Sequence, residues 1–169
     1  ETSLPFIKST KINEKGQHKL LLEFSNNIDK ISLRVGMSAA DILGAKENLL
    51  SEIPEWNFEK VRANTVKQWN DELGKIKISL EDKEKATIFY TALYHSYLAP
   101  NIFSDVNGKY RGRDNKIHAI SNEQKQYTVF SLWDTYRATH PLFTLMQQKR
   151  TNEFITTFLR QFDEGKDLP

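Results

Sequence analysis

The feature that most constrains the fold is a change of hydrophobic period near residue 36. Upstream of it, residues 18–24 form a compact apolar run, and residues 31–35 alternate between apolar and polar side chains, as half-buried strands do. Downstream, apolar residues recur every three or four positions, as they do on one face of a helix. The sequence therefore predicts an α+β chain with strands first and helices after.

The two strand-like runs are separated by Ser25-Asn26-Asn27, and Asn tolerates the positive φ of a tight turn. We therefore expect an antiparallel hairpin over residues 18–35. Because a lone hairpin is marginally stable in water, further strands of this sheet are expected before residue 1. Both chain ends look interrupted, so we expect the chain to be a piece of a longer protein, called the parent below.

Three helices are expected next. Ser38 followed by Asp41 resembles a capping box at the start of the first helix. Steps of three and four between apolar positions over residues 58–73 predict a second helix of about four turns. Asp82 is a candidate cap for the third.

A tight turn is expected at Asn107-Gly108, because this pair lies between extended residues and suits the positive φ angles of a type I′ hairpin turn. A calcium loop of the EF-hand type beginning at Asp105 does not fit. That loop needs Gly and Glu at the positions where this chain has Tyr110 and Lys116.

Two further helices are expected near the C-terminus. One covers residues 129–148, with Pro141 expected to break or kink it. The other begins at a cap on Thr151 and stops at Gly165 and Pro169. The apolar face of this last helix consists of Phe154, Ile155, Phe158, Leu159 and Phe162.

Composition narrows the functional classes. The chain has 24 Lys plus Arg against 22 Asp plus Glu, a net charge of +2, which argues against binding nucleic acid or a membrane surface through bulk charge. It has no cysteine, which excludes zinc-thiolate sites and a cysteine nucleophile. No apolar run approaches the ~20 residues that span a bilayer. The four histidines have no metal-ligand spacing.

The candidate site lies in residues 130–142. Trp133, Asp134 and Arg137 fall in the first two turns of a helix that Ser131 could cap. In one interpretation, Trp133 belongs to the core, and Asp134 and Arg137 form a surface ion pair. In the other, the segment binds sugar, because an indole packs on the C–H face of a pyranose and a carboxylate accepts hydrogen bonds from two neighbouring hydroxyls.

An ordered set of segments resembles glycoside hydrolase family 92, the calcium-dependent, inverting exo-α-mannosidases. The segments are Phe89–Ser96, Pro100-Asn101, Phe103–Gly112, Ser131–Ala138, and Gly165 with Leu168-Pro169. Asn48-Leu49 and the stretch from Trp56 to Asn70 also resemble the family's connecting segment. The resemblance covers roughly residues 30 to 169.

The resemblance implies a domain organisation. Residues 1–36 would be the last strands of an N-terminal β-sandwich and residues 37–80 a helical linker. Residues 81–169 would then be the first helices of an incomplete (α/α)6 barrel. This division agrees with the change of period read from the residues.

The resemblance also implies that Trp133 and Asp134 help to grip a terminal mannose and that Arg137 orients Asp134. The family's acid, its base and its calcium ligands match nothing in this chain. We therefore expect no catalytic and no metal-binding residue here, calcium in the parent, and no turnover by the 169-residue chain alone.

The resemblance implies that the parent hydrolyses terminal α-linked mannose from glycans, with α-1,2 linkages expected first. It also implies a secreted, periplasmic or cell-surface location. Two alternatives stay open. One is another (α/α)6 glycosidase, trehalase-like or glucoamylase-like, and the other is a non-catalytic carbohydrate-binding module.

Overall fold

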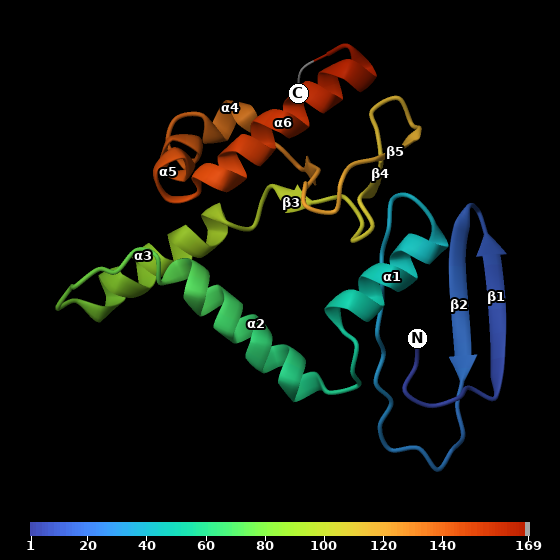
Figure 1. The fold of residues 1–169 in the computed structure, drawn as a ribbon. Coiled ribbons are helices and arrows are strands. Elements are labelled where there is room, and N and C mark those ends of the chain that lie inside the picture. The colour runs from blue at the N-terminus through green and yellow to red at the C-terminus, as the bar shows by residue number, and fades with distance from the viewer. Residues whose placement is uncertain (168–169) are drawn as a thin grey trace.

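A computed structural model describes residues 1–167, and in these residues the chain is a mixed α/β structure with three two-stranded antiparallel sheets and six helices (Figure 1). An N-terminal hairpin lies beside the first helix, the second and third helices form an arm, and the last three helices lie together near the C-terminus. Leu168 and Pro169, which belonged to the last expected stop and the last family motif, lie outside the described residues.

The N-terminal hairpin pairs β1 (Lys8–Glu14) with β2 (Gln17–Glu23). Lys15 and Gly16 between them both have positive φ, 49° and 78°, as a two-residue type I′ turn requires. The strand expected over residues 18–24 is therefore confirmed. The prediction that residues 31–35 pair with this strand is wrong. The two-residue turn at Lys15-Gly16 pairs it with the residues before it in sequence instead.

Residues 31–35 make only a single bridge, between Leu33 and Thr2. Arg34 lies in the same segment, and its guanidinium donates to the Ile53 carbonyl at 2.7 Å and packs 4.0 Å over the Trp56 ring. This segment thereby ties the N-terminal residues to the end of the first helix.

The three expected helices are confirmed as α1 (Ile42–Glu52), α2 (Phe58–Leu73) and α3 (Lys83–Ser96). Asp82 caps α3 as expected, accepting from two backbone N–H groups. The cap of α1 is Asp41 rather than Ser38, because the Asp41 carboxylate accepts the Gly44 N–H at 2.7 Å.

Four short strands follow α3. β3 (Asn101–Ile102) pairs with β6 (Tyr127–Thr128), and β4 (Lys109–Arg111) pairs with β5 (Ile117–Ala119). The expected turn at Asn107-Gly108 is present, but its type is wrong. Gly108 has a φ of 83°, Asn107 has no positive φ, and the Gly108 N–H bonds to the Asp105 carbonyl at 2.9 Å. These features are typical of a type I turn followed by a left-handed glycine.

The break expected in the helical residues 129–148 is present, but it lies before Pro141, and the start of the helix at Val129 is wrong. Val129 has a left-handed φ of 63°, and the helical residues divide into α4 (Leu132–Thr135) and α5 (Thr139–Met146). The break lies before Pro141, which occupies the first turn of α5, where its missing N–H costs no helical hydrogen bond.

The last helix, α6 (Gln148–Gly165), starts before its expected cap. Thr151 lies inside the helix, and its hydroxyl donates to the Gln147 carbonyl at 3.1 Å. Lys166 ends α6 in the left-handed conformation, with a φ of 65°.

The core is an aromatic cluster between α5, α6 and β6. Tyr127, Phe143 and Phe154 are buried, and the Tyr127 and Phe154 rings meet edge to face at 4.8 Å between centroids. Phe158 packs on the cluster from the expected face of α6. The other members of that face, Ile155, Leu159 and Phe162, are exposed.

A polar stripe on α6 fixes the strand region beside the core. The hydroxyls of Tyr127 and Tyr110 donate to Glu153 and Glu164 at 2.6 and 2.5 Å. Burial raises the pKa of both tyrosines, and the carboxylate partners add to this shift. Because β6 leads directly into α4, this stripe also fixes where the candidate site begins.

Candidate functional site

Trp133 lies on the surface of the short helix α4. Its side chain is 81% exposed, so the interpretation that placed it in the core is wrong for the described residues 1–167. Tyr136, one turn on, is also exposed. Two aromatic rings therefore stand in solvent on the segment that the sequence singled out.

Asp134 is exposed beside Trp133 and is held by Ser131. The Ser131 hydroxyl donates to Asp134 Oδ2 at 2.6 Å. Ser131 occupies the N-cap position of α4 as expected, but its side chain makes no hydrogen bond to the helix backbone. The serine thus acts on the carboxylate instead of capping the helix.

Arg137 lies beyond the end of α4 and turns toward its neighbour in sequence. Its Nε donates to the Tyr136 hydroxyl at 3.0 Å, and its guanidinium carbon lies 5.3 Å from the centre of that ring. Within residues 1–167 the structure gives no ion pair between Arg137 and Asp134, so the expected contact between them is absent. The sugar-binding roles of Trp133, Asp134 and Arg137 stay predictions.

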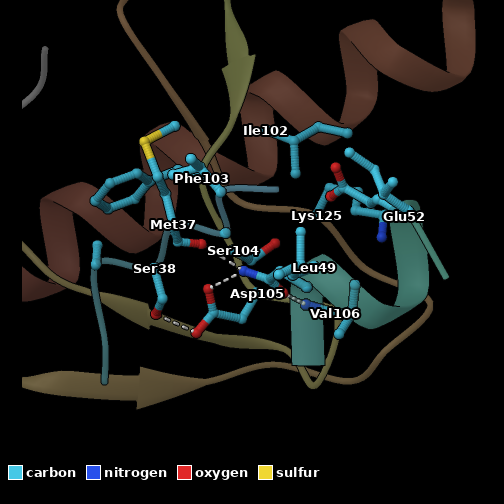
Figure 2. A pocket seen from close by; sticks show the side chains of 15 residues that line it. Met37, Ser38, Leu49, Glu52, Ile102, Phe103, Ser104, Asp105, Val106 and Lys125 are labelled. Carbon is cyan, nitrogen blue, oxygen red and sulfur yellow. Dashed lines mark hydrogen bonds between the residues drawn. The ribbon is translucent and has the colours of Figure 1, made fainter. Parts of the chain in front are cut away.

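A separate cavity of about 570 Å³ lies between α1, the loop before it and the start of the strand region (Figure 2). Met37 and Phe103 lie together on one side of it, and Glu52 and Lys125 on the other. Asp105 contributes the buried acid of this cavity, with 4% of its surface exposed.

The Asp105 carboxylate is fully engaged. Ser38 Oγ donates to Oδ2 at 2.6 Å, and Asn48 Nδ2 donates to Oδ1 at 2.8 Å. A Cβ at Gly44 would lie 2.2 Å from Asp105 Oδ2, so only glycine allows this approach of α1. Asp105 therefore acts as a structural anchor of the turn that follows it.

Sequence reasoning missed this anchor. Its partners lie 57 and 67 residues away along the chain. The family resemblance did include Asn48 and Asp105, in two different motifs, but nothing in either motif indicated that they meet. The one usable sequence signal was that Asn48 lies in an expected helix and Asp105 lies beside the expected turn at Asn107-Gly108.

A second polar cluster lies at the β4–β5 turn. The His118 ring and the Asp114 carboxylate are 2.9 Å apart, and this hydrogen bond lowers the pKa of the Asp114 carboxyl.

His140 lies elsewhere, against the rings of Phe143 and Phe154, and burial lowers its pKa.

No group of three or more acidic, histidine or cysteine side chains converges among residues 1–167 in a way that could hold a metal ion. The same part of the chain contains no helix long and apolar enough to cross a bilayer.

Comparison with known proteins supplies the context for this site. The model of the glycosyl hydrolase family 92 catalytic domain matches residues 44–169. A secreted glycosidase of uncharacterised function from Arthroderma benhamiae is 32% identical over 118 residues, which are 67% of this chain and 14% of that protein.

Solved structures are also similar. A family GH92 alpha-mannosidase from Bacteroides thetaiotaomicron is 40% identical with a TM-score of 0.73, and the match covers 78% of this chain and 18% of that one. A GH92 inverting mannosidase from the same organism is 23% identical with a TM-score of 0.83, covering 100% of this chain and 25% of that one. The second match supports the fold alone. The chain spans a quarter or less of each of these relatives.

Proposed function

Since the chain belongs to glycosyl hydrolase family 92, we propose that it is part of an inverting exo-α-mannosidase that releases terminal α-linked mannose from glycans, with α-1,2 linkages as the first substrates to test. The observation that supports a role in sugar binding is the exposed pair of Trp133 and Asp134. An indole in solvent beside a carboxylate offers a pyranose an apolar face and an acceptor for two hydroxyls.

We propose the same domain division for the parent. Residues 1–36 would be the last strands of a β-sandwich, and residues 37–80 would be a helical linker. Residues 81–169 would be the first helices of an (α/α)6 barrel. The large apolar side chains left exposed support this proposal, because a monomer rarely leaves extended apolar faces in water. Ile42, Leu43, Met37 and Leu145 are each at least 70% exposed.

Chemistry in such an enzyme needs an acid that protonates the leaving oxygen and a base that activates water, about 6.5–9.5 Å apart. We propose that both lie outside this chain. Asp105 and Asp114 do not fill these roles. Asp105 is buried with both oxygens bonded, and Asp114 pairs with His118. The 169-residue chain alone is therefore expected to be inactive.

Calcium is proposed for the parent and not for these residues. Calcium takes six to eight oxygen ligands, and no cluster of three acidic side chains exists among residues 1–167 to supply them. Residues 1–167 therefore offer the ion no acidic ligand set. For the parent we further propose a secreted, periplasmic or cell-surface location, as in the fungal relative, which is named a secreted glycosidase.

The experiment is to express the parent and offer it α-linked mannobioses, trehalose and maltose. We expect mannose from one or more mannobioses, with loss of activity on treatment with EDTA. Hydrolysis of trehalose or maltose without mannobiose would instead support a different (α/α)6 glycosidase. NMR of the first product distinguishes inversion, which yields β-mannose, from retention.

Variants then test the site. Asp134→Ala should lower kcat/KM by about 100-fold, the effect of losing two hydrogen bonds to a charged group. Asp163→Ala is the matched control, because Asp163 is an exposed aspartate on α6 with no proposed contact to substrate. Equal activity of the two variants would show that Asp134 does not bind the substrate.

A further inference from the structure

We propose that Ser131 and Tyr136 are positioning residues, which keep Asp134 and Arg137 apart so that both retain free hydrogen-bonding groups for one sugar. This inference rests on the proposed function, since it concerns the same pocket. It assigns a role in the sugar site to Tyr136, which the sequence left without one, and to Ser131, which the sequence offered only as a helix cap.

A break in the helix separates Asp134 from Arg137. In a continuous helix Asp134 and Arg137 would be neighbours at i and i+3, and opposite charges at that spacing attract. Here α4 ends at Thr135, and residues 136–138 separate it from α5. Arg137 therefore leaves the helix on which Asp134 lies.

The entry to α4 is also redirected by the backbone. Val129, between β6 and α4, has a φ of 63°, which is unfavourable for a β-branched residue. Its side chain is exposed, so burial of the side chain does not explain this conformation. Strained backbone of this kind is characteristic of sites where geometry matters more than local stability.

Ser131 supplies the second step. A serine at an N-cap ordinarily accepts a hydrogen bond from a backbone N–H of the first turn. Ser131 instead donates to Asp134 Oδ2 at 2.6 Å and makes no such cap. Oδ1 of Asp134 has no hydrogen bond within residues 1–167 and remains available as an acceptor.

Tyr136 supplies the third step. Its hydroxyl accepts from Arg137 Nε at 3.0 Å, and its ring lies under the guanidinium. The two terminal nitrogens of Arg137 make no hydrogen bond to the described residues 1–167. Tyr136 therefore uses one donor of Arg137, at Nε, and its ring holds the cation without using the others.

Ser131 and Tyr136 thereby keep the Asp134 carboxylate and the Arg137 guanidinium from pairing with each other. An Asp134–Arg137 ion pair would satisfy each group with the other and leave little for a ligand. Held apart, the carboxylate accepts from sugar hydroxyls while the guanidinium donates to sugar oxygens, and charge-assisted hydrogen bonds are the strong ones.

The test measures kcat and KM of the parent on its mannoside. Ser131→Ala should raise KM about tenfold and leave kcat within about twofold, because the loss falls on binding. Ser131→Thr keeps the hydroxyl and should restore most of the affinity. Tyr136→Phe should raise KM about threefold. Ser96→Ala is the control, because the Ser96 hydroxyl only bonds to the Ala92 carbonyl in α3.

A KM for Ser131→Ala equal to that of wild type, or a Thr variant no better than Ala, would overturn the proposal. If Asp134→Ala impairs the enzyme while Ser131→Ala does not, only the positioning role fails. If the parent releases no mannose, the proposed function fails instead. A crystal structure of the unliganded Ser131→Ala parent still decides the positioning role in that case. We expect Asp134 within about 4 Å of Arg137, and an unmoved carboxylate would contradict us.

Discussion

The side-chain amide of Asn48 joins both parts of the turn at Asp105. Its Nδ2 donates to the Asp105 carboxylate at 2.8 Å, and its Oδ1 accepts the Val106 N–H at 2.8 Å. One residue on α1 thereby fixes a side chain and a backbone group that lie 57 and 58 residues further along the chain. The connection fixes the turn at Asp105 against α1.

Asp105→Ala is expected to lower the free energy of unfolding of the parent by about 3 kcal/mol. The change leaves the part-buried Ser38 hydroxyl and one N–H of the Asn48 amide without the carboxylate that accepts from them, although Asn48 Nδ2 keeps its bond to the Met37 carbonyl. Urea denaturation measures the loss. Asp29→Ala, at an exposed aspartate, is the control and should change stability by less than about 0.5 kcal/mol. Similar values for both variants would mean that Asp105 is not an anchor.

Arg160→Lys tests a further polar side chain of α6, which lies in sequence between Glu153 and Glu164 and also bonds to the strand region. Arg160 Nη1 donates to the Lys125 carbonyl and to Gln126 Oε1, both at 3.1 Å, and Nη2 donates to Gln124 Oε1 at 2.9 Å. One ammonium cannot span these acceptors, so we expect a loss of about 1–2 kcal/mol in the free energy of unfolding.

The matched control for this variant is Arg62→Lys. Arg62 pairs with Glu59 at 3.4 Å on the exposed side of α2, where ion pairs contribute little. We expect almost no change there. A loss at Arg62 as large as that at Arg160 would show that an Arg-to-Lys change costs stability wherever it is made, and the fork geometry at Arg160 would then not explain the loss.

The pH dependence of stability should contain a contribution from His140. Burial against the aromatic cluster lowers its pKa below the usual 6.5, so the unfolded state binds a proton more readily than the folded state. The contribution is therefore complete above pH 6.5 and is lost as the pH falls from there through the folded pKa.

His140→Phe keeps an aromatic ring in place and cannot titrate. Urea midpoints measured at several pH values between about 5 and 8 should fall less steeply on the acid side for the variant than for wild type. Parallel curves would contradict the buried, neutral state of His140.

The parts of the fold that local patterns encode could be predicted. The bounds of α2 follow from its apolar spacing and from the stop at Gly74, and the start of α3 follows from Asp82, because caps and periodicity act within a few residues. The N-terminal hairpin could not be assigned correctly. Lys15 is an uncommon residue for a left-handed turn, so the turn that selects the partner of β2 gave a weak signal.

In the candidate site, too, the sequence could indicate the residues but not their contacts. Its residues could be selected because Trp and Asp side chains suit a pyranose. Their contacts could not, since the strand that leads into α4 is held by residues distant in sequence. Glu153 and Thr157 of α6 both bond to Tyr127 of β6. The buried anchor at Asp105 likewise depends on contacts between residues far apart in sequence.

The most direct test is a crystal structure of the parent with mannose bound. We expect the Trp133 ring within about 4 Å of sugar carbons and an Asp134 oxygen about 2.8 Å from a sugar hydroxyl. A structure in which Trp133 is packed among apolar side chains, with the bound sugar contacting neither residue, would contradict the account.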